Sequence, residues 1–530
     1  MAPGYGSCET RNSQVRKISR AEEEPPLTPL LNRTGPRRFI AKRYIFSLLA
    51  FTACCLAVSF NMNLSIAIVS MVKRKVAFNK TTPNTTEVPQ TNGSEIPKFN
   101  WNADIESLAL GAVYYGQLVS FIPGGRMAEL YGGKRMLCFC TLIASLATLV
   151  SPLAASCNAY AFVITRIFVG LGTGPIIPIV FYMLNRWIPH RERSFHASFI
   201  LSGYGVGSFL AVIVSGALCG THFLGGWPSV FYTGGLCGIL WCLLCIFMMC
   251  ETPETHPTIS QEELEYIQIG IGTVKKEKIL KIPWKEMALS VPLWALAIGF
   301  FGQFWLLGFF STVHALYMGT VLNLPIVKNG ILSCLPHLLR AIATCAASFP
   351  VDILLRSRTV SVGCVRKSAT VINTVVSCAA FLGITMVGRN VTATTLLFIL
   401  GGVLGEFVTF GVCLACIDIA PSLSGTVSGL INIVGVFPFF LIPVLVGAVT
   451  HYENSIRKWN TVFYISIAIV SVSTLIFVIF GDLKPQSWGV LQDTKPSNDD
   501  VNDEEPEETK AKEVELEDKR DLLNSSYHRL

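Results

Sequence analysis

Charged side chains inside long apolar stretches are the residues of this chain most able to do chemistry. Arg166, Arg340 and Glu406 each lie in such a stretch, and His337 lies one helical turn before Arg340. A charge at the centre of a bilayer costs roughly 2.5–3.5 kcal/mol on insertion scales, so such charges usually line a cavity or pair with one another. A guanidinium presents a rigid fork of donors that suits a carboxylate or phosphate. We therefore interpret Arg166 and Arg340 as candidate anion ligands. The alternative for Arg166 is a structural ion pair or a snorkelling side chain.

Arg340 and Glu406 are expected to form an ion pair. They lie a similar number of residues into the apolar stretches 328–350 and 393–417, which we expect to cross the membrane in the same direction. At about 1.5 Å per helical residue the two side chains reach nearly the same depth, where pairing compensates both charges. Two roles stay open for this pair: a purely structural salt bridge, or a substrate and coupling site. In the second, Glu406 is the proton-linked or gating acid, and His337 adds a titratable group.

The elements that position these residues follow from hydropathy. The chain of 530 residues is 51% hydrophobic and 15% charged, with a mean hydropathy of +0.51, which excludes a soluble multidomain protein. About twelve stretches have the ~20 residues that a helix needs to cross a bilayer. We predict an all-α membrane protein whose twelve transmembrane helices cover 44–72, 104–125, 136–155, 158–182, 196–220, 228–250, 291–320, 328–350, 368–388, 393–417, 423–449 and 459–481.

The basic residues predict the orientation of these spans. They gather in alternate loops, namely Arg37, Arg38, Lys42 and Arg43, then Lys134 and Arg135, then Arg191 and Arg193, then 275–285, then Arg356, Arg358, Arg366 and Lys367. The positive-inside rule makes these loops and both termini cytosolic. Topology and contact with anionic lipid therefore account for the net charge of +7, and we expect no nucleic-acid partner. The opposite side receives loop 73–103, whose acceptor sequons at Asn79, Asn84 and Asn92 agree with glycosylation on the lumenal face.

An internal repeat divides the chain into two six-helix halves. Trp227-Pro-Ser-Val-Phe-Tyr232 opens the sixth span, Trp459-Asn-Thr-Val-Phe-Tyr464 opens the twelfth, and the loop around Glu129 has a counterpart around Asp352. We expect pseudo-symmetric halves in parallel register, in which a capping box at Ser260-x-x-Glu263 starts a short helix of the linker. The predicted divisions are a disordered tail 1–40, halves 41–250 and 291–481, a cytosolic linker 251–290, and an acidic disordered tail 482–530.

Enzyme chemistry is not expected. The sequence has no convincing Ser-His-Asp cluster and no paired Cys-x-x-Cys spacing, and its 17 cysteines lie mostly in apolar runs where they act as small hydrophobes. We therefore expect no catalytic residues, no metal and no cofactor.

Several motifs together resemble a known family. They are Asn63-Leu-Ser-Ile-Ala-Ile-Val69, Ile122-Pro-Gly-Gly125, Arg166 with Gly170-Leu-Gly172, Asp418-Ile-Ala-Pro421, and the second Trp-x-x-Val-Phe-Tyr motif. The chain resembles solute carrier family 17 of the major facilitator superfamily, which holds sialin, the vesicular glutamate transporters and the type I phosphate cotransporters. The resemblance implies a secondary active transporter of small organic anions (sialic acid, an acidic amino acid or similar) or phosphate. It would work by alternating access coupled to protons, sodium or membrane potential.

The resemblance places a substrate-facing arginine at Arg166, which would hold the anionic group of the substrate. The family pattern does not supply Arg340 or Glu406. On our own interpretation Arg340 would add a second cation, while Asn61, Tyr115 and Asn432 would supply neutral hydrogen bonds. The chain departs from the family pattern elsewhere: Asn61 stands where organic-anion carriers usually have arginine, and Val169 and Thr173 stand where sialin-like sequences have acids. The alternative function is a non-transporting membrane receptor or scaffold that keeps the carrier fold.

The amino-terminal segment predicts where the protein resides. The sequence from Glu22 to Leu31 resembles the acidic dileucine signal of lysosomal family members. We expect a lysosomal or vesicular membrane, with the plasma membrane as the alternative.

Overall fold

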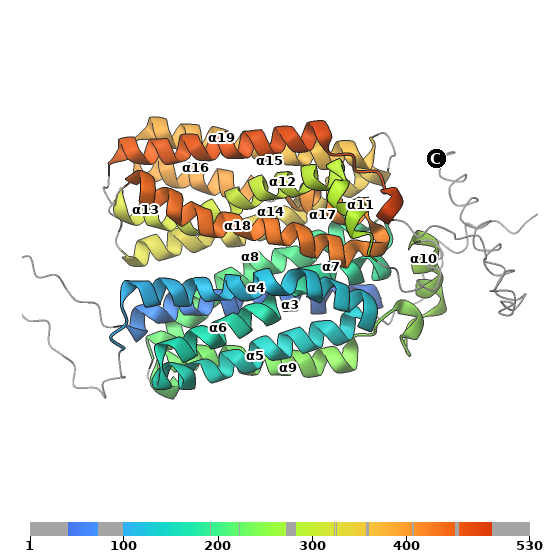
Figure 1. Cartoon of the computed structure of the whole chain (residues 1–530), viewed down its shortest axis with the longest axis horizontal. Helices are drawn as coiled ribbons and strands as arrows, with labels where there is room; N and C mark the ends of the chain where they lie inside the picture. Colours follow the sequence, from blue (N-terminus) through green and yellow to red (C-terminus); the bar gives the residue numbers. More distant parts are fainter. Residues whose placement is uncertain are drawn as a thin grey trace, which may run out of the picture. The chain divides into compact units, whose positions relative to one another are not determined.

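The computed structural model describes residues 41–72, 99–190, 192–221, 223–271, 282–322, 324, 326–356, 360–404, 408–450 and 455–489. Within these ranges all regular structure is helical, apart from one isolated bridge between Val72 and Phe99 (Figure 1). The predicted tails up to residue 40 and beyond residue 489, the three sequons and Glu406 lie outside the described residues.

The amino-terminal half contains six spans. Its helices are α3 (Lys42–Met71), α4 (Ala103–Tyr131), α5 (Gly133–Cys157), α6 (Ala159–Thr173), α7 (Ile176–Trp187), α8 (Arg193–Cys219) and α9 (Pro228–Met248). Helices α6 and α7 form one span, Ala159–Trp187, that is interrupted at Gly174 and Pro175 because proline has no backbone N–H to donate into the helix. The short η1 (Phe223–Gly225) precedes α9.

The linker and the carboxy-terminal half follow. The linker contains η2 (Pro253–Thr255), α10 (Gln261–Ile271) and α11 (Trp284–Leu289). The next elements are α12 (Val291–Gly308), the π-helix η3 (Phe309–Val313), α13 (His314–Thr320), α14 (Ile326–Arg356), α15 (Val362–Val387), α16 (Val391–Leu404), the π-helix η4 (Thr409–Cys413), α17 (Leu414–Ile419), η5 (Pro421–Leu423), α18 (Ser424–Thr450), α19 (Ile456–Phe480) and η6 (Ser487–Gly489).

The described helices confirm the prediction of an all-α membrane protein. Eleven of them are long and apolar enough to cross a bilayer. The expected span 393–417 is covered by two shorter apolar helices, Val391–Val403 and Thr409–Ile419, on either side of residues 405–407, which are not described.

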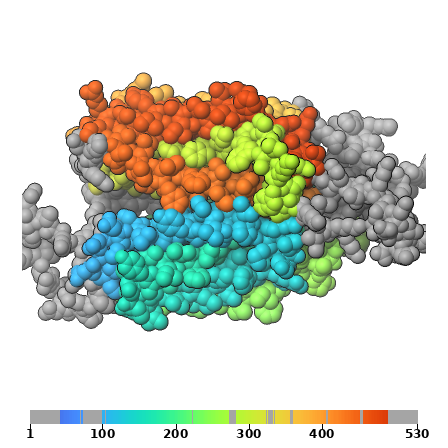
Figure 2. All heavy atoms as spheres, in the orientation of Figure 1, coloured from blue at the N-terminus to red at the C-terminus, as the bar shows by residue number. Residues whose placement is uncertain are grey.

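The two halves meet along two helix pairs. One pair is α4 with α18 and the other is α8 with α14. In the first pair a Cβ atom on Gly429 would lie 2.5 Å from the carbonyl oxygen of Phe121, so only glycine lets the two backbones approach this closely. Figure 2 shows the atoms of α4 (blue) and α18 (orange) in contact on one face of the molecule.

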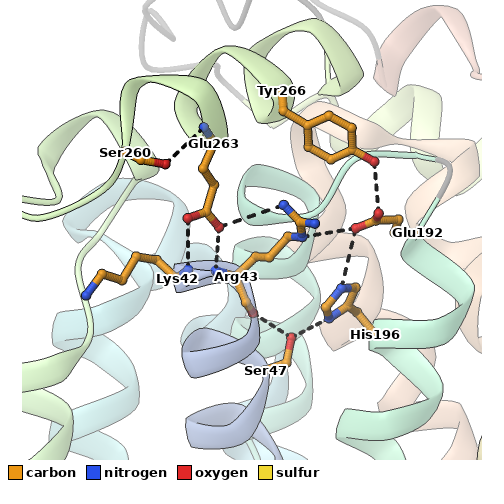
Figure 3. A network of polar contacts seen from close by, with 8 residues as sticks. All are labelled: Lys42, Arg43, Ser47, Glu192, His196, Ser260, Glu263 and Tyr266. Carbon is orange, nitrogen blue, oxygen red and sulfur yellow. Dashed lines mark hydrogen bonds and ion pairs between the residues drawn. The ribbon is translucent and has the colours of Figure 1, made fainter. Parts of the chain in front are cut away.

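Helix α10 is attached to the starts of α3 and α8 (Figure 3). The Oγ of Ser260 accepts the backbone N–H of Glu263 at 3.3 Å, which is one half of the predicted capping box. The carboxylate of Glu263 does not close that box. It accepts the backbone N–H groups of Lys42 and Arg43, at 3.0 and 3.1 Å, and so caps the first turn of α3.

Glu192, immediately before α8, connects these elements. Its carboxylate lies 3.1 Å from Nε of Arg43 and accepts the hydroxyl of Tyr266, a residue of α10, at 2.9 Å. Burial of Glu192 opposes its ionisation. Contacts with His196, Arg43 and Tyr266 outweigh that effect and lower the pKa of Glu192 to about 2. The linker helix is therefore held by a carboxylate that stays ionised at neutral pH.

Candidate functional site

A cavity lies between the two helix pairs that join the halves. It encloses about 1240 Å³ of empty space, including the part continuous with solvent. Helices α3, α4, α6, α7 and α8 line it from one half, and α12, η3, α14, η4 and α18 line it from the other. Both halves of an internally repeated membrane protein therefore contribute to one central site.

Four of the sequence-predicted site residues line this cavity. They are Asn61 on α3, His337 and Arg340 on α14, and Asn432 on α18. Arg340 is the one arginine or lysine, and no aspartate or glutamate is present, among the described residues that line the cavity. Glu406, the predicted partner of Arg340, lies outside the described residues, so the ion pair stays a prediction.

Arg166 lies behind the cavity lining. Its side chain is fully buried, at 0% exposure, and its Nη1 and Nη2 atoms donate to the carbonyl oxygens of Phe60 (3.0 Å) and Asn61 (3.2 Å). Two of its donors are therefore occupied by the backbone of α3. In this geometry Arg166 fixes the position of Asn61, which lines the cavity.

Tyr115 and the cavity lie on different sides of α4. The Tyr115 side chain is 50% exposed and its ring stacks on Phe440 at 5.5 Å between centroids, whereas Tyr114 is among the lining residues. Successive residues of a helix differ by about 100°, so only one of two adjacent tyrosines can face a given side. Gln117 and Phe121, which follow Tyr114 by three and seven residues, line the same cavity. This helical spacing puts the three side chains on one face of α4, and it is the signal in the sequence that favours Tyr114 over Tyr115.

A row of neutral polar groups lines the cavity on the side of the amino-terminal half, and two of its members, Gln117 and Thr173, are not among the sequence-predicted site residues. Nε2 of Gln117 donates to Oγ1 of Thr173 at 3.1 Å, and that hydroxyl donates to Oδ1 of Asn61 at 3.4 Å. Asn432, on the opposite half, donates from Nδ2 to the carbonyl oxygen of Ser428 at 2.8 Å. These side chains are held in place by one another and by the backbone.

Two acidic residues close one end of the interface between the halves. Glu129 on α4 accepts the backbone N–H and the hydroxyl of Thr426 on α18, each at 2.7 Å. Asp352 on α14 accepts the backbone N–H of Phe195 on α8 at 3.1 Å. Each carboxylate therefore caps the first turn of a helix in the other half, where the helix dipole favours a negative charge. The internal repeat relates these two acids in the sequence, but it does not indicate their contacts with the opposite half.

Two helical repeats around a shared cavity, with helix-end contacts between the halves, are the architecture of membrane carriers. Comparison with known proteins gives the same class: the model of the Major Facilitator Superfamily matches residues 49–443. The chain belongs to this superfamily and, within it, to solute carrier family 17, as its motifs predicted. It is a carrier and not an enzyme.

The relatives cover most of the chain. Sialin of Homo sapiens is 30% identical over 492 residues, which are 90% of this chain and 98% of sialin. Vesicular glutamate transporter 3 of Danio rerio is 28% identical over 93% of this chain and 81% of its own length. Sodium-dependent phosphate transport protein 1 of Oryctolagus cuniculus is 25% identical over 86% of this chain and 97% of its own.

A solved structure supports the fold. The proton:xylose symporter XylE superposes with a TM-score of 0.63 over 84% of this chain and 97% of its own, at 14% identity. This likeness concerns the arrangement of the helices alone.

Proposed function

We propose that this protein is a secondary active transporter that moves a small organic anion or phosphate across a lysosomal or vesicular membrane by alternating access. The observation that carries the proposal is the central cavity, which places Arg340 between two halves that are joined at one end by Glu129 and Asp352. The names of the relatives, which include sialin, vesicular glutamate transporters and a phosphate transport protein, support an anionic substrate.

In the proposed cycle the anion enters the cavity from the end opposite Glu129 and Asp352. The guanidinium of Arg340 attracts its charge, and the polar row of Asn61, Gln117 and Thr173 donates or accepts hydrogen bonds from the opposite wall. The halves then rock so that the contacts of Glu129 with Thr426 and of Asp352 with Phe195 break. With both termini in the cytosol, these contacts close the cytosolic end and the anion enters from the lumen.

We assign the coupling of anion transport to a proton gradient or membrane potential to ionisable side chains beside the anion. His337 lines the cavity one helical turn from Arg340, so its protonation would change the charge that the anion meets. Glu406 remains the proposed proton-linked or gating acid. Protons or membrane potential drive the cycle in this proposal, and sodium is the alternative coupling ion.

The test is uptake by the purified protein in proteoliposomes. Phosphate, glutamate and N-acetylneuraminate are supplied with and without an imposed pH gradient or potential. We expect saturable uptake of at least one anion that responds to a gradient and falls at least about tenfold in Arg340→Gln, as expected when a charge-assisted contact is removed. Arg457→Gln is the matched control, because Arg457 is exposed at the start of α19 and does not line the cavity. Absence of uptake with folded protein would favour the receptor or scaffold.

A further inference from the structure

The chemistry of the cavity wall narrows the substrate class of the transporter proposed above, and this inference rests on that function. We propose that the substrate is an organic anion with a single negative charge and a flat, apolar body, such as an aromatic carboxylate or sulfonate. Three features of the cavity support this proposal: its aromatic side chains, the number of its basic side chains, and the hydrogen bonds that its polar side chains already make.

The cavity lining is rich in aromatic side chains. Seven phenylalanine or tyrosine side chains are among the lining residues, from both halves. Phe300 and Phe304 on α12 stack at 4.2 Å between ring centroids, and Tyr114 on α4 stacks on Phe439 on α18 at 5.5 Å. Aromatic rings favour a flat partner that can stack or meet them edge-on.

Helix α18 brings these two stacked pairs together. Phe300 packs against Gly435, where an added Cβ would lie 2.5 Å from its ring, and Phe439 lies one turn further along α18. A Cβ on Gly308, one turn after Phe304, would lie 3.5 Å from the ring of Phe439. The rings of Phe300, Phe304, Phe439 and Tyr114 all line the cavity beside this part of α18, and we call these four side chains the aromatic wall.

With Glu406 protonated, as its proposed role as the proton-linked acid allows, the charged groups favour one negative charge on the solute. Arg340 is the one arginine or lysine among the described lining residues, and Arg166, the second expected cation, donates to the carbonyl oxygens of Phe60 and Asn61 behind the lining. A second negative charge on the same solute would have to face the aromatic wall without a basic side chain of the described lining beside it. Desolvating that charge is unfavourable, so a dianion is disfavoured against a monoanion of the same shape.

The polar groups disfavour a solute with many hydroxyls. Gln117, Thr173 and Asn61 bond to one another, Asn432 bonds to Ser428, and Ser208 donates to the carbonyl oxygen of Tyr204 at 2.8 Å. A sugar acid would bring more donors and acceptors than these five side chains, each already bonded to a protein group, can pair. Groups of the solute left without hydrogen bonds lower its affinity, whereas a ring system has none to satisfy.

The test varies charge and body separately. Uptake and binding are measured in proteoliposomes with 2-naphthalenesulfonate (one charge, aromatic), 2,6-naphthalenedisulfonate (two charges, same body) and methanesulfonate (one charge, no ring). Sulfonates stay ionised, so they do not cross the lipid as neutral acids. We expect 2-naphthalenesulfonate to be transported with a KM at least about tenfold below that of either other probe, because each omitted feature removes one of the contacts argued above.

Two phenylalanines of α18 provide matched variants. Phe439 belongs to the aromatic wall, whereas Phe437, two residues earlier, is 43% exposed and is not a lining residue. We expect Phe439→Ala to raise the KM for 2-naphthalenesulfonate by about 2- to 10-fold, the range expected for loss of a stacked ring, and Phe437→Ala to leave it unchanged. Phe439→Leu keeps an apolar side chain and much of the volume but has no ring. It should resemble the alanine variant, and it guards against loss of binding through misfolding.

The outcomes separate this inference from the proposed function. Uptake of phosphate, glutamate or N-acetylneuraminate together with failure of 2-naphthalenesulfonate would overturn the substrate class and leave the transporter intact. Equal KM values for the mono- and disulfonate, or equal effects of the Phe439 and Phe437 variants, would also overturn it. If no anion of either panel is bound or transported by folded protein, the proposed function itself fails.

Discussion

Arg166 and Arg340 carry the same guanidinium in different surroundings. Arg166 is fully buried and donates to two main-chain carbonyl groups of α3, whereas Arg340 lines the cavity between the halves. Nothing in the amino-acid types separates these cases, because a main-chain carbonyl acceptor leaves no trace in the sequence. We infer that Arg166 is a positioning residue that holds Asn61 and that Arg340 contacts the anion.

The substitutions Arg166→Lys and Arg340→Lys distinguish these roles. An ammonium cannot reproduce the fork that spans Phe60 and Asn61, so Arg166→Lys should cost on the order of 1.5–3 kcal/mol, the value of a hydrogen bond from a charged group. We expect a lower apparent Tm for Arg166→Lys without anion, and for Arg340→Lys a nearly unchanged Tm with a raised KM. A raised KM with unchanged Tm in Arg166→Lys would instead make Arg166 an anion ligand.

At the scale of the helices, the attachment of α10 depends on one ionised carboxylate. Glu192 has a pKa lowered to about 2 by its contacts with His196, Arg43 and Tyr266, in spite of burial. A carboxyl group whose pKa is lower in the folded protein than in the unfolded chain stabilises the folded protein. For a glutamate this stabilisation is fully present at pH values above about 4.3, the pKa in the unfolded chain, and it is lost as the pH falls toward 2.

Glu192→Gln tests this attachment. The variant should lower the apparent Tm of the detergent-solubilised protein by a few degrees at pH 7, and the difference from wild type should shrink between about pH 4.5 and pH 2. Glu265→Gln, on the exposed side of α10, serves as the control. A Tm difference that stays constant over this pH range would show that the charge of Glu192 does not hold α10.

The helices and their order could be predicted from the sequence, but their rotation could not. A bilayer demands about twenty apolar residues for each span, and this demand is visible in hydropathy alone. Spans such as α9 are apolar on all sides, so periodicity gives little indication of which face meets the cavity. For this reason hydropathy does not distinguish Tyr115 from Tyr114, which lines the cavity, and it does not point to Gln117 or Thr173. The Ser260 cap of α10 is predicted by its sequence motif, whereas nothing in the sequence indicates that Glu263 caps α3.

At the scale of the whole molecule, two carboxylates join the halves. Glu129 holds the start of α18 and Asp352 holds the start of α8, each from the opposite half. Hydrogen bonds of this kind contribute roughly 1.5–3 kcal/mol each. A loss of 1.4 kcal/mol changes a two-state population tenfold, so removing one carboxylate should shift the balance between the closed and open forms of this end.

Hydrogen exchange of Glu129→Gln measures this shift. We expect faster exchange of the amides at the start of α18, where Thr426 donates to Glu129, and also at the start of α8, where Phe195 donates to Asp352. Exchange at both places follows if the halves move as rigid bodies, because the two contacts then open together. Faster exchange confined to α18 would contradict a concerted opening.

Counterflow is the measurement that tests alternating-access anion transport most directly. Proteoliposomes preloaded with an unlabelled anion are diluted into a trace of the same anion in labelled form, with no pH gradient or potential. An alternating-access carrier exchanges the two, so labelled anion should accumulate transiently above its equilibrium level, and Arg340→Gln should abolish the overshoot. Phosphate, glutamate, N-acetylneuraminate and 2-naphthalenesulfonate are each used in turn. Absence of an overshoot with all four anions, from protein that is folded and inserted, would contradict the account.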